Sequence, residues 1–161
     1  MTNAPADDAM LVYRMDVTEP LSEPPLSKGE FVFVRGITGI SANFMAWGRT
    51  LGWPGAVKTA LKVLSGKRLF FGVKSGNSMV QSGWANIGFC RHYVIESDSI
   101  VLGELWTAPE HRGKGLASVA LRRVIVRLHD CGFKRFYIDT KLDNPASQRM
   151  IEKAGFSNRI Q

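Results

Sequence analysis

The sequence predicts an α+β fold, a mixed α/β arrangement in which helices flank a twisted central sheet of mostly antiparallel strands. Three strand-like segments between residues 67 and 107 are joined by short polar turns, which is typical of an antiparallel meander. A helix and one more strand follow, and a strand–helix–strand connection favours a parallel pairing in the same sheet. We predict one domain over residues 30–161, preceded by an N-terminal arm over residues 1–29.

The composition is that of an ordinary globular protein. Of its 161 residues, 45% are hydrophobic and 22% are charged. The net charge of +7 favours an anionic partner, which is a nucleic acid, a membrane surface or a phosphorylated small molecule. The sequence shows neither a helix-turn-helix pattern nor zinc-ligand spacing, so we expect no nucleic-acid partner.

No segment predicts export or a membrane span. The first ten residues carry acids where a signal peptide needs basic residues, and no run of 18 uncharged apolar residues exists. Cys90 and Cys131 follow no metal or redox spacing, which favours reduced thiols. The three histidines, at positions 92, 111 and 129, are too dispersed for a metal site. We therefore expect a cytoplasmic protein without integral membrane contact and without metal.

The first elements are a strand, a second strand and two helices. Prolines concentrate in the N-terminal arm and bias it toward extended backbone, with a short strand over residues 10–17. A second strand is expected over residues 31–37. Residues 41–66 then predict two helices, the first capped by Ser41 and the second carrying Pro54 in its first turn.

The second of these helices has one apolar face, formed by Val57, Leu61 and Leu64. In an amphipathic helix such a face packs on the core. The segment before it is rich in large apolar residues, including Phe44, Met45 and Trp47, and core packing explains most of them. The alternative interpretation is that the remaining large apolar residues form an aromatic wall that binds a sugar or an apolar acceptor.

Three strands, a helix, a strand and a last helix complete the order. The strands are expected over residues 67–74, 78–95 and 100–107, and the helix over residues 116–130. A further strand is predicted over residues 133–140. In the last helix Asn144 is the expected cap, Pro145 occupies the first turn and Gly155 ends it.

The stretch "TAPEHRGKGLA", residues 107–117, joins a predicted strand to a predicted helix. A helix begins with amide N–H groups that lack internal acceptors, and its dipole places partial positive charge there. Gly113 and Gly115 let the backbone bend and approach a ligand closely, while Arg112 and Lys114 add full charges. This combination predicts a binding site for a pyrophosphate, and a bland turn with solvated basic residues is the alternative.

The segment "RGKGLA" resembles the [Q/R]-x-x-G-x-[G/A] signature of the GNAT acyltransferase superfamily. The preceding "ELWTAP" and the later "NPAS…EKAGF" are similar to neighbouring parts of that family. The resemblance implies acetyl-CoA as co-substrate, with its pyrophosphate on the amides of residues 112–117 and its pantetheine arm beside residues 105–107. The residues that it implies for coenzyme binding are Leu105, Trp106, Thr107, Arg112, Gly113, Lys114, Gly115, Leu116, Ala117, Asn144 and Ser147.

The resemblance also implies direct acetyl transfer to an amine, without an acyl-enzyme. Glu104 stands where many relatives place a carboxylate base, although a plain surface glutamate is the alternative. Relatives often carry a tyrosine as general acid directly before the "EK-GF" run, where this chain has Ile151. Tyr137 is our candidate replacement, with sheet packing as the simpler interpretation.

Many relatives continue for about two more strands, whereas this chain ends soon after Phe156. The sheet edge beyond the 133–140 strand would then be open, and we expect residues 10–17 or a partner subunit, in a homodimer, to cover it. The predicted function is acetyl-CoA-dependent N-acetylation of a small-molecule amine, with an amino sugar as one candidate. The alternatives are a coenzyme A-binding module without turnover, a protein N-terminal or lysine acetyltransferase, and a nucleic-acid-binding module.

Overall fold

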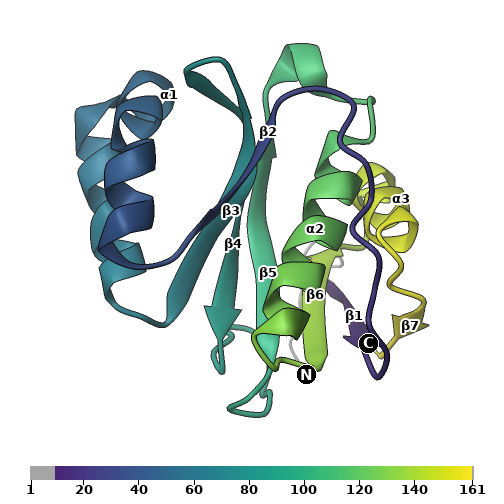
Figure 1. The fold of residues 1–161 in the computed structure, drawn as a ribbon. Helices are drawn as coiled ribbons and strands as arrows, with labels where there is room; N and C mark the ends of the chain where they lie inside the picture. Colours follow the sequence, from purple (N-terminus) through teal and green to yellow (C-terminus); the bar gives the residue numbers. More distant parts are fainter. Residues whose placement is uncertain (1–9, 161) are drawn as a thin grey trace, which may run out of the picture.

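The computed structural model describes residues 10–160, whose strands form one seven-stranded sheet in the order β2-β3-β4-β5-β6-β1-β7 (Figure 1). The start of the predicted N-terminal arm, residues 1–9, and the final residue of the predicted domain lie outside the described part. The strands are β1 (Met10–Asp16), β2 (Glu30–Val34), β3 (Arg68–Ser75), β4 (Ser78–Ile87), β5 (Ile100–Thr107), β6 (Arg135–Lys141) and β7 (Asn158–Arg159). The helices are α1 (Gly36–Leu64), the short 3₁₀ helix η2 (Pro109–His111), α2 (Leu116–Asp130) and α3 (Pro145–Lys153).

The predicted fold class is confirmed. Strands β2 to β5 form an antiparallel meander, and β5 then pairs in parallel with β6. This parallel pairing covers only three residue pairs and ends at Leu102 and Ile138, although β5 continues to Thr107. Beyond Leu102 the edge of β5 that faces β6 therefore has no strand partner among residues 10–160.

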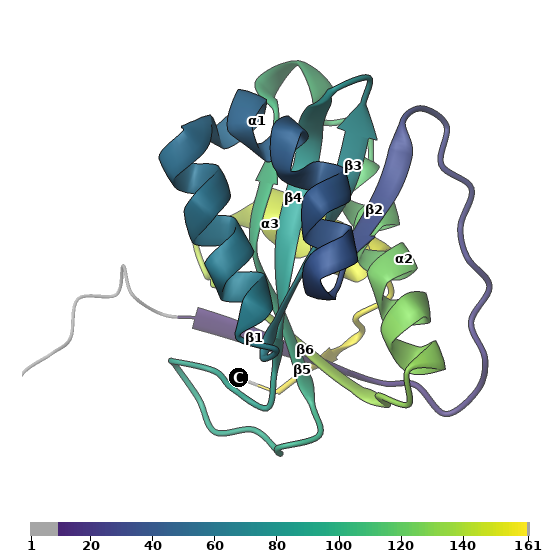
Figure 2. The same cartoon turned by 60° about the vertical axis from the view of Figure 1, so that its left-hand side comes forward.

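Helices cover both faces of the sheet, with α1 on one side and α2 and α3 on the other (Figures 1 and 2). On the α2 side the core packs Phe71, Leu102 and Phe136 against residues such as Leu121 and Leu128 of the helix. A second cluster lies under α1 around three rings in edge-to-face contact. Those rings belong to Trp47, Phe70 and Trp84, with centroids 5.1 and 5.3 Å apart.

Three predicted boundaries are wrong. The strand expected over residues 31–37 ends at Val34, because helix α1 begins at Gly36. Strand β4 ends at Ile87, and residues 88–99 form a loop, not the continuation of the strand to residue 95. Gly88 begins this loop at φ +62°, where a Cβ would lie 2.5 Å from the carbonyl oxygen of Ser97. Helix α1 begins at Gly36, so Ser41 is not its cap, and the Ser41 hydroxyl donates to the carbonyl of Thr38 inside the first turns.

The expected pair of helices is present within α1 as two segments joined at a kink. Gly52 has φ +73°, outside the helical region, and Pro54 opens the second segment as predicted. The expected core face of that segment is wrong, because Val57, Leu61 and Leu64 are 48%, 64% and 53% exposed. The helix packs on the sheet through its smaller residues instead, namely Ala56, Thr59 and Val63.

The sheet edge at β6 is covered by the chain's own N-terminal strand, as predicted. Strand β1 pairs antiparallel with β6 over seven residues, from Met10 opposite Lys141 to Asp16 opposite Arg135. The two-residue strand β7 then pairs with the outer side of β1 at Tyr13 and Arg14. This covering removes the open edge through which a homodimer was expected, so the pairings give that dimer no support.

Candidate active site

Glu104 lies in a β-bulge of strand β5. Trp106 pairs with Ser82 and Gly103 pairs with Trp84, so two residues of β5 face the single residue between them on β4. Glu104 has φ +50° and is the one non-glycine residue at positive φ among those described. A bulge bends its strand and redirects a side chain, and bulges are frequent next to active sites.

The turn after β5 leads directly into the N-terminus of α2. Gly113 and Gly115 have φ +72° and +74°, and Gly115 is the residue that precedes the first helical residue, Leu116. Two basic side chains are bound back onto the turn. The Arg112 Nε donates to the Thr107 carbonyl at 3.0 Å, and the Lys114 Nζ donates to the Glu110 carbonyl at 2.6 Å.

A cavity of about 680 Å³ opens onto this turn. Its walls are the end of β5, the N-terminus of α2 and the first turns of α3. Every coenzyme-binding residue predicted from the sequence lines it except Lys114, whose ammonium is bound to Glu110. Arg112, Arg149 and Lys153 also line it, and none of its described lining residues is acidic. The cavity is therefore suited to an anionic group.

Helix α3 closes the far wall of the cavity. The side chain of Asn144 accepts a hydrogen bond from the Ser147 amide at 3.1 Å, which confirms the predicted cap. Ser118 of α2 donates to the carbonyl of Met150 at 3.1 Å and fixes the two helices to each other. The cap thus orients the start of the helix along the cavity.

Sequence reasoning missed several lining residues or left them without a role. They are His111, Ser118, Ala146, Arg149, Met150 and Lys153. Four of them lie on α3 at spacings of three and four residues, so one face of this helix points into the cavity. Extending the helical periodicity from Ser147 would have indicated Met150 and then Lys153, whereas Ala146 and Arg149 fall outside that series.

A smaller cavity of about 120 Å³ contains the Glu104 side of the bulge. It lies between strand β5 and the loop of residues 88–99, and we call it the bulge cavity. Its lining includes Arg68, Arg91, Glu104 and Asp139. The carboxylate of Glu104 forms ion pairs with Arg68 and, at 3.5 Å, with Lys62 of α1. Glu104 is thus bound to two cations.

These cations set the protonation of Glu104. Partial burial raises the pKa of the carboxyl, but the hydrogen bond from Arg68 and the charges of Arg68 and Lys62 outweigh it. The pKa of Glu104 therefore lies below its ordinary value. The group is ionised at neutral pH, and the same pairing makes it a weaker base than an unpaired glutamate.

Tyr137 is not brought to either cavity. Its ring is buried against Val12 and Val101, and its hydroxyl donates to the carboxylate of Glu96 at 2.9 Å. Burial and the Glu96 charge raise the pKa of Tyr137. This geometry gives no support to Tyr137 as the general acid and matches the alternative interpretation of a sheet-packing aromatic.

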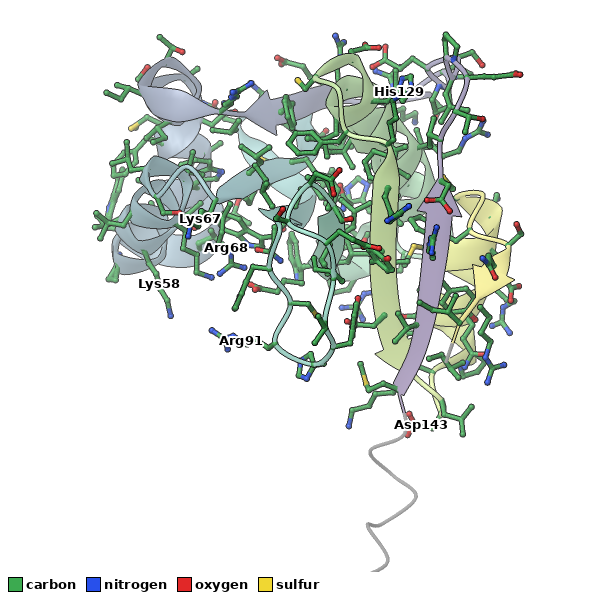
Figure 3. The ribbon with its side chains drawn as sticks, turned by 90° about the horizontal axis from the view of Figure 1, so that it is seen from below. Lys58, Lys67, Arg68, Arg91, His129 and Asp143 are labelled. Atoms are coloured by element: carbon green, nitrogen blue, oxygen red, sulfur yellow. The ribbon has the colours of Figure 1, made fainter. Side chains whose placement is uncertain are left out.

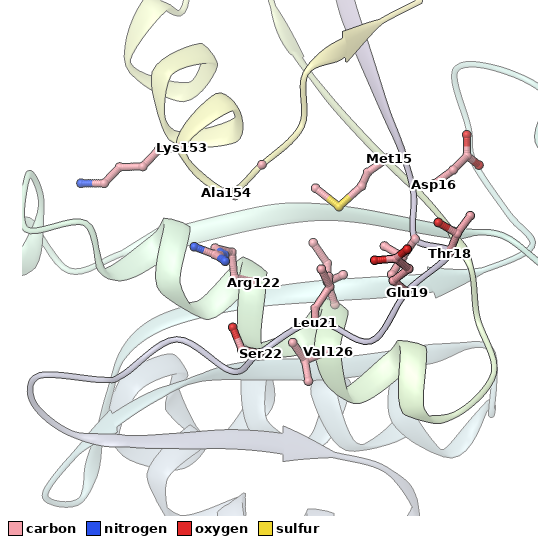
Figure 4. Close-up of a pocket in the computed structure, with 13 residues that line it drawn as sticks. Met15, Asp16, Thr18, Glu19, Leu21, Ser22, Arg122, Val126, Lys153 and Ala154 are labelled. Atoms are coloured by element: carbon pink, nitrogen blue, oxygen red, sulfur yellow. The ribbon is translucent and has the colours of Figure 1, made fainter.

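A third cavity of about 440 Å³ lies between the segment after β1 and helix α2 (Figure 4). Figure 4 shows Arg122 and Lys153 at one side of it and Asp16 and Glu19 at the other. None of the predicted site residues lines this cavity. Lys153 lines both this cavity and the one at the turn, and the mixed charges here favour no particular ligand.

The described residues contain no cluster of three or more His, Cys, Asp or Glu side chains that could hold a metal ion. In the same part of the chain, no helix is both long enough and apolar enough to cross a membrane.

The bulged strand β5, the turn into the N-terminus of α2 and the diverging strands β5 and β6 all lie within one segment that a protein-family model matches. The chain belongs to the acetyltransferase (GNAT) family, whose model matches residues 54–156. A comparison with curated proteins finds no significant match.

Solved structures share the fold at low sequence identity. An acetyltransferase of the GNAT family from Colwellia psychrerythraea is 16% identical with a TM-score of 0.59, over 95% of this chain and 56% of that one. This chain therefore spans about half of that protein's length. AAC(6')-Iy, in complex with the bisubstrate analogue CoA-S-monomethyl-acetylneamine, is 16% identical with a TM-score of 0.62, over 84% of this chain and 95% of that one. The aminoglycoside 6'-N-acetyltransferase AAC(6')-Ih from Acinetobacter baumannii is 19% identical with a TM-score of 0.58, over 82% and 94% of the two chains.

Proposed function

We propose that this protein is an acetyl-CoA-dependent N-acetyltransferase that transfers an acetyl group directly to the amine of a small molecule, with amino sugars among the candidates. The carrying observation is the 680 Å³ cavity, where the N-terminus of α2 and three cationic side chains meet the end of β5. AAC(6')-Iy, which shares the fold, has been solved with coenzyme A and with a coenzyme A conjugate bound.

The coenzyme would be held mainly by main-chain groups. The amides of residues 112–117 would bind its pyrophosphate, because the first turn of α2 has N–H groups without helical acceptors. The pantetheine arm would pair with residues 105–107, since β5 lacks a strand partner on its β6 side beyond Leu102. Asn144 and Ser147 would contact this arm from α3, and Arg149 or Lys153 would meet a further phosphate.

Acetyl-CoA supplies an activated thioester. The amine nitrogen forms a bond to the thioester carbonyl carbon, the carbon–sulfur bond breaks, and the proton lost by the amine balances the one gained by the thiolate. We propose that Glu104 accepts the amine proton, through a water molecule, since its carboxylate is ionised and borders the bulge cavity. The proposal names no side chain as the donor of the proton that the leaving thiolate gains.

Thermal unfolding and thiol release test this proposal. A ligand that binds only the folded state raises its stability, so acetyl-CoA should raise Tm and double-stranded DNA should not. Free thiol should then appear when a panel of amines is added. Peptides with a free N-terminus or a lysine belong in the panel, because a protein acceptor is the rival substrate class. Unchanged Tm with acetyl-CoA would refute the proposal.

One observation favours a second candidate, a coenzyme A-binding module without turnover. Glu104 is occupied by Lys62 and Arg68, and Tyr137 is bound to Glu96 away from both cavities. A Tm increase with acetyl-CoA, but no thiol release with any amine, would select this module. The cytoplasmic location predicted from the sequence stays a prediction.

A further inference from the structure

The surroundings of the bulge cavity are rich in basic side chains from separate elements. Lys62 of α1 and Arg68 of β3 bind Glu104, and Arg91 of the 88–99 loop lines the cavity. Figure 3 shows Lys58 and Lys67 on the same side of the molecule as Arg68 and Arg91. Three segments distant in sequence therefore bring cations to the place where an acceptor must approach Glu104.

The acidic groups nearby do not cancel this charge. Glu104 and Asp139 line the cavity, against Arg68, Arg91 and the adjacent Lys62. Glu96, on the same loop, is turned away, because its carboxylate accepts hydrogen bonds from Arg135 and Tyr137. Adding Lys58 and Lys67 increases the positive excess at this side of the molecule.

Two of the cations are held in place by an aromatic ring. The Lys62 ammonium lies 4.9 Å from the centre of the Trp84 ring, and the Arg68 guanidinium carbon lies 4.8 Å from it. Cation–π contacts of this kind orient the charge before a ligand arrives. Trp84 itself is 7% exposed and is fixed by its contact with Phe70. Lys62 and Arg68 therefore hold fixed positions beside the bulge cavity before a ligand binds.

Arg68 and Arg91 retain hydrogen-bonding capacity. Arg68 uses Nη2 for Glu104, and its Nε is buried without a hydrogen-bond partner among the described residues. Arg91 is exposed and makes no ion pair within residues 10–160. A guanidinium presents several N–H donors in a plane, which matches the oxygens of a phosphate or a carboxylate.

We propose that the acceptor is an amine that also carries an anionic oxygen group, a phosphate or a carboxylate, which Arg91 and Arg68 bind while the amine lies near Glu104. This inference rests on the proposed function and specifies its substrate class. A polycationic aminoglycoside would bring further positive charge next to Lys62, Arg68 and Arg91, so this chain differs in substrate class from neighbours with that name. The same cations would lower the pKa of the acceptor ammonium and favour the neutral amine that attacks.

A matched set of acceptors tests the proposal. Glucosamine, glucosamine 6-phosphate and 2-amino-2-deoxyglucuronic acid share one amine and differ at C6, and tobramycin represents the polycations. Ethanolamine with phosphoethanolamine extends the comparison to another scaffold. From thiol release we expect kcat/KM to be about tenfold or more higher for the anionic member of a pair. The phosphate and carboxylate arms distinguish the two sources of negative charge.

The variant Arg91→Gln should remove most of this preference, which is measured as the ratio of kcat/KM between the anionic and the neutral member of a pair. Lys28→Gln is the matched control, since Lys28 is exposed, carries the same charge and lies before β2, outside the lining of the cavity. Equal kcat/KM for the paired acceptors, or a preference for tobramycin, would overturn the inference and leave the proposed function standing.

A binding measurement decides the case in which no amine of the set reacts. Coenzyme A at saturation fills its own phosphate sites, and inorganic phosphate is then titrated by calorimetry. Phosphate binding that is weakened at least about fivefold by Arg91→Gln and unchanged by Lys28→Gln would support the anion site. No binding, or binding indifferent to Arg91, would overturn it. Failure of acetyl-CoA to bind at all would instead count against the proposed function.

Discussion

Arg68 of β3 and Glu104 of β5 form an ion pair that passes over the intervening strand β4, at the ring of Trp84. The pair fixes the side chain of a residue whose backbone adopts φ +50°, a conformation that non-glycine residues rarely adopt. Strained backbone of this kind persists where the surrounding contacts hold it and is common at functional sites. The ion pair therefore connects Glu104 and the bulge to the basic side chains around the bulge cavity.

Replacing Glu104 with glutamine should lower kcat by about a hundredfold, because a positioned proton acceptor contributes on that order. Steady-state thiol release from about pH 6 to about pH 9 is the measurement. Glu30→Gln is the control, since Glu30 is a largely exposed carboxylate paired with Lys74 on the far edge of the sheet. If Glu104→Gln keeps the wild-type kcat over this range, Glu104 is not the base.

The turn before α2 can be tested with two glycines of matched backbone. Gly115 has φ +74°, and Gly66, which follows α1, has φ +72°. A Cβ at Gly66 would have no neighbouring atom within 4 Å among the described residues. Alanine at either position should destabilise the protein by about 1–2 kcal/mol, the cost of the left-handed conformation. Only Gly115→Ala should also reduce the Tm increase produced by acetyl-CoA, measured by thermal unfolding.

A Cβ at Gly115 would lie 3.4 Å from the Lys153 Nζ, the flexible end of a side chain, so the change falls on the cavity and not on the core. If both alanine variants keep the full acetyl-CoA response, the turn does not bind the coenzyme. The same conclusion follows if both lose it equally, because the loss would then track stability alone.

The sequence predicted the elements that follow from strong local signals. Helix α2 was placed with both ends correct, since glycines flank a clear apolar periodicity. The Asn144 cap and Pro145 marked the start of α3 for the same reason. The prediction chose the wrong face of α1 because apolar residues occur on several sides of this helix. The face that packs on the sheet contains small residues such as Ala56. Periodicity alone cannot choose between two apolar faces.

Sequence reasoning could group the residues of the turn, which are adjacent in the chain, but it could not place side chains that meet from distant elements. The turn of residues 112–117 is local, so its glycines were informative. The ion pairs of Glu104 join residues that are 36 and 42 positions apart, and they depend on strand order and on the kink at Gly52. Tyr137 was nominated by residue type alone, and its direction follows from its register opposite Val101.

Tyr137→Phe is expected to leave kcat unchanged. The hydroxyl that it removes is bound to Glu96 and lines neither the cavity at the turn before α2 nor the bulge cavity. It should lower the free energy of unfolding by about 1 kcal/mol, the usual net contribution of one hydrogen bond. Thiol-release kinetics and urea unfolding check the two halves of the prediction. A fall in kcat of about a hundredfold would restore Tyr137 as the general acid.

The ion pairs of Asp16 should make stability depend on pH in the acid range. Asp16 accepts hydrogen bonds from Arg14 at 2.8 Å and from Arg135 at 2.9 Å, at the end of the pairing between β1 and β6. The Arg14 bond, together with that of Arg135, outweighs burial and holds the pKa of Asp16 below its ordinary value. A carboxyl with a lowered folded-state pKa contributes stability above its unfolded pKa, and this contribution disappears as pH falls through the folded-state value.

Asp16→Asn should therefore destabilise the protein at neutral pH by about 1 kcal/mol or less, because the pair is largely exposed and screened by solvent. The difference from wild type should begin to shrink as pH falls below about 3.9, the ordinary aspartate value, and should vanish below the lowered pKa. Urea unfolding at neutral and at acid pH measures both. Asp143→Asn is the control, since Asp143 is exposed and makes no ion pair within residues 10–160. A penalty for Asp16→Asn that persists unchanged in acid would show that its role is packing and not charge.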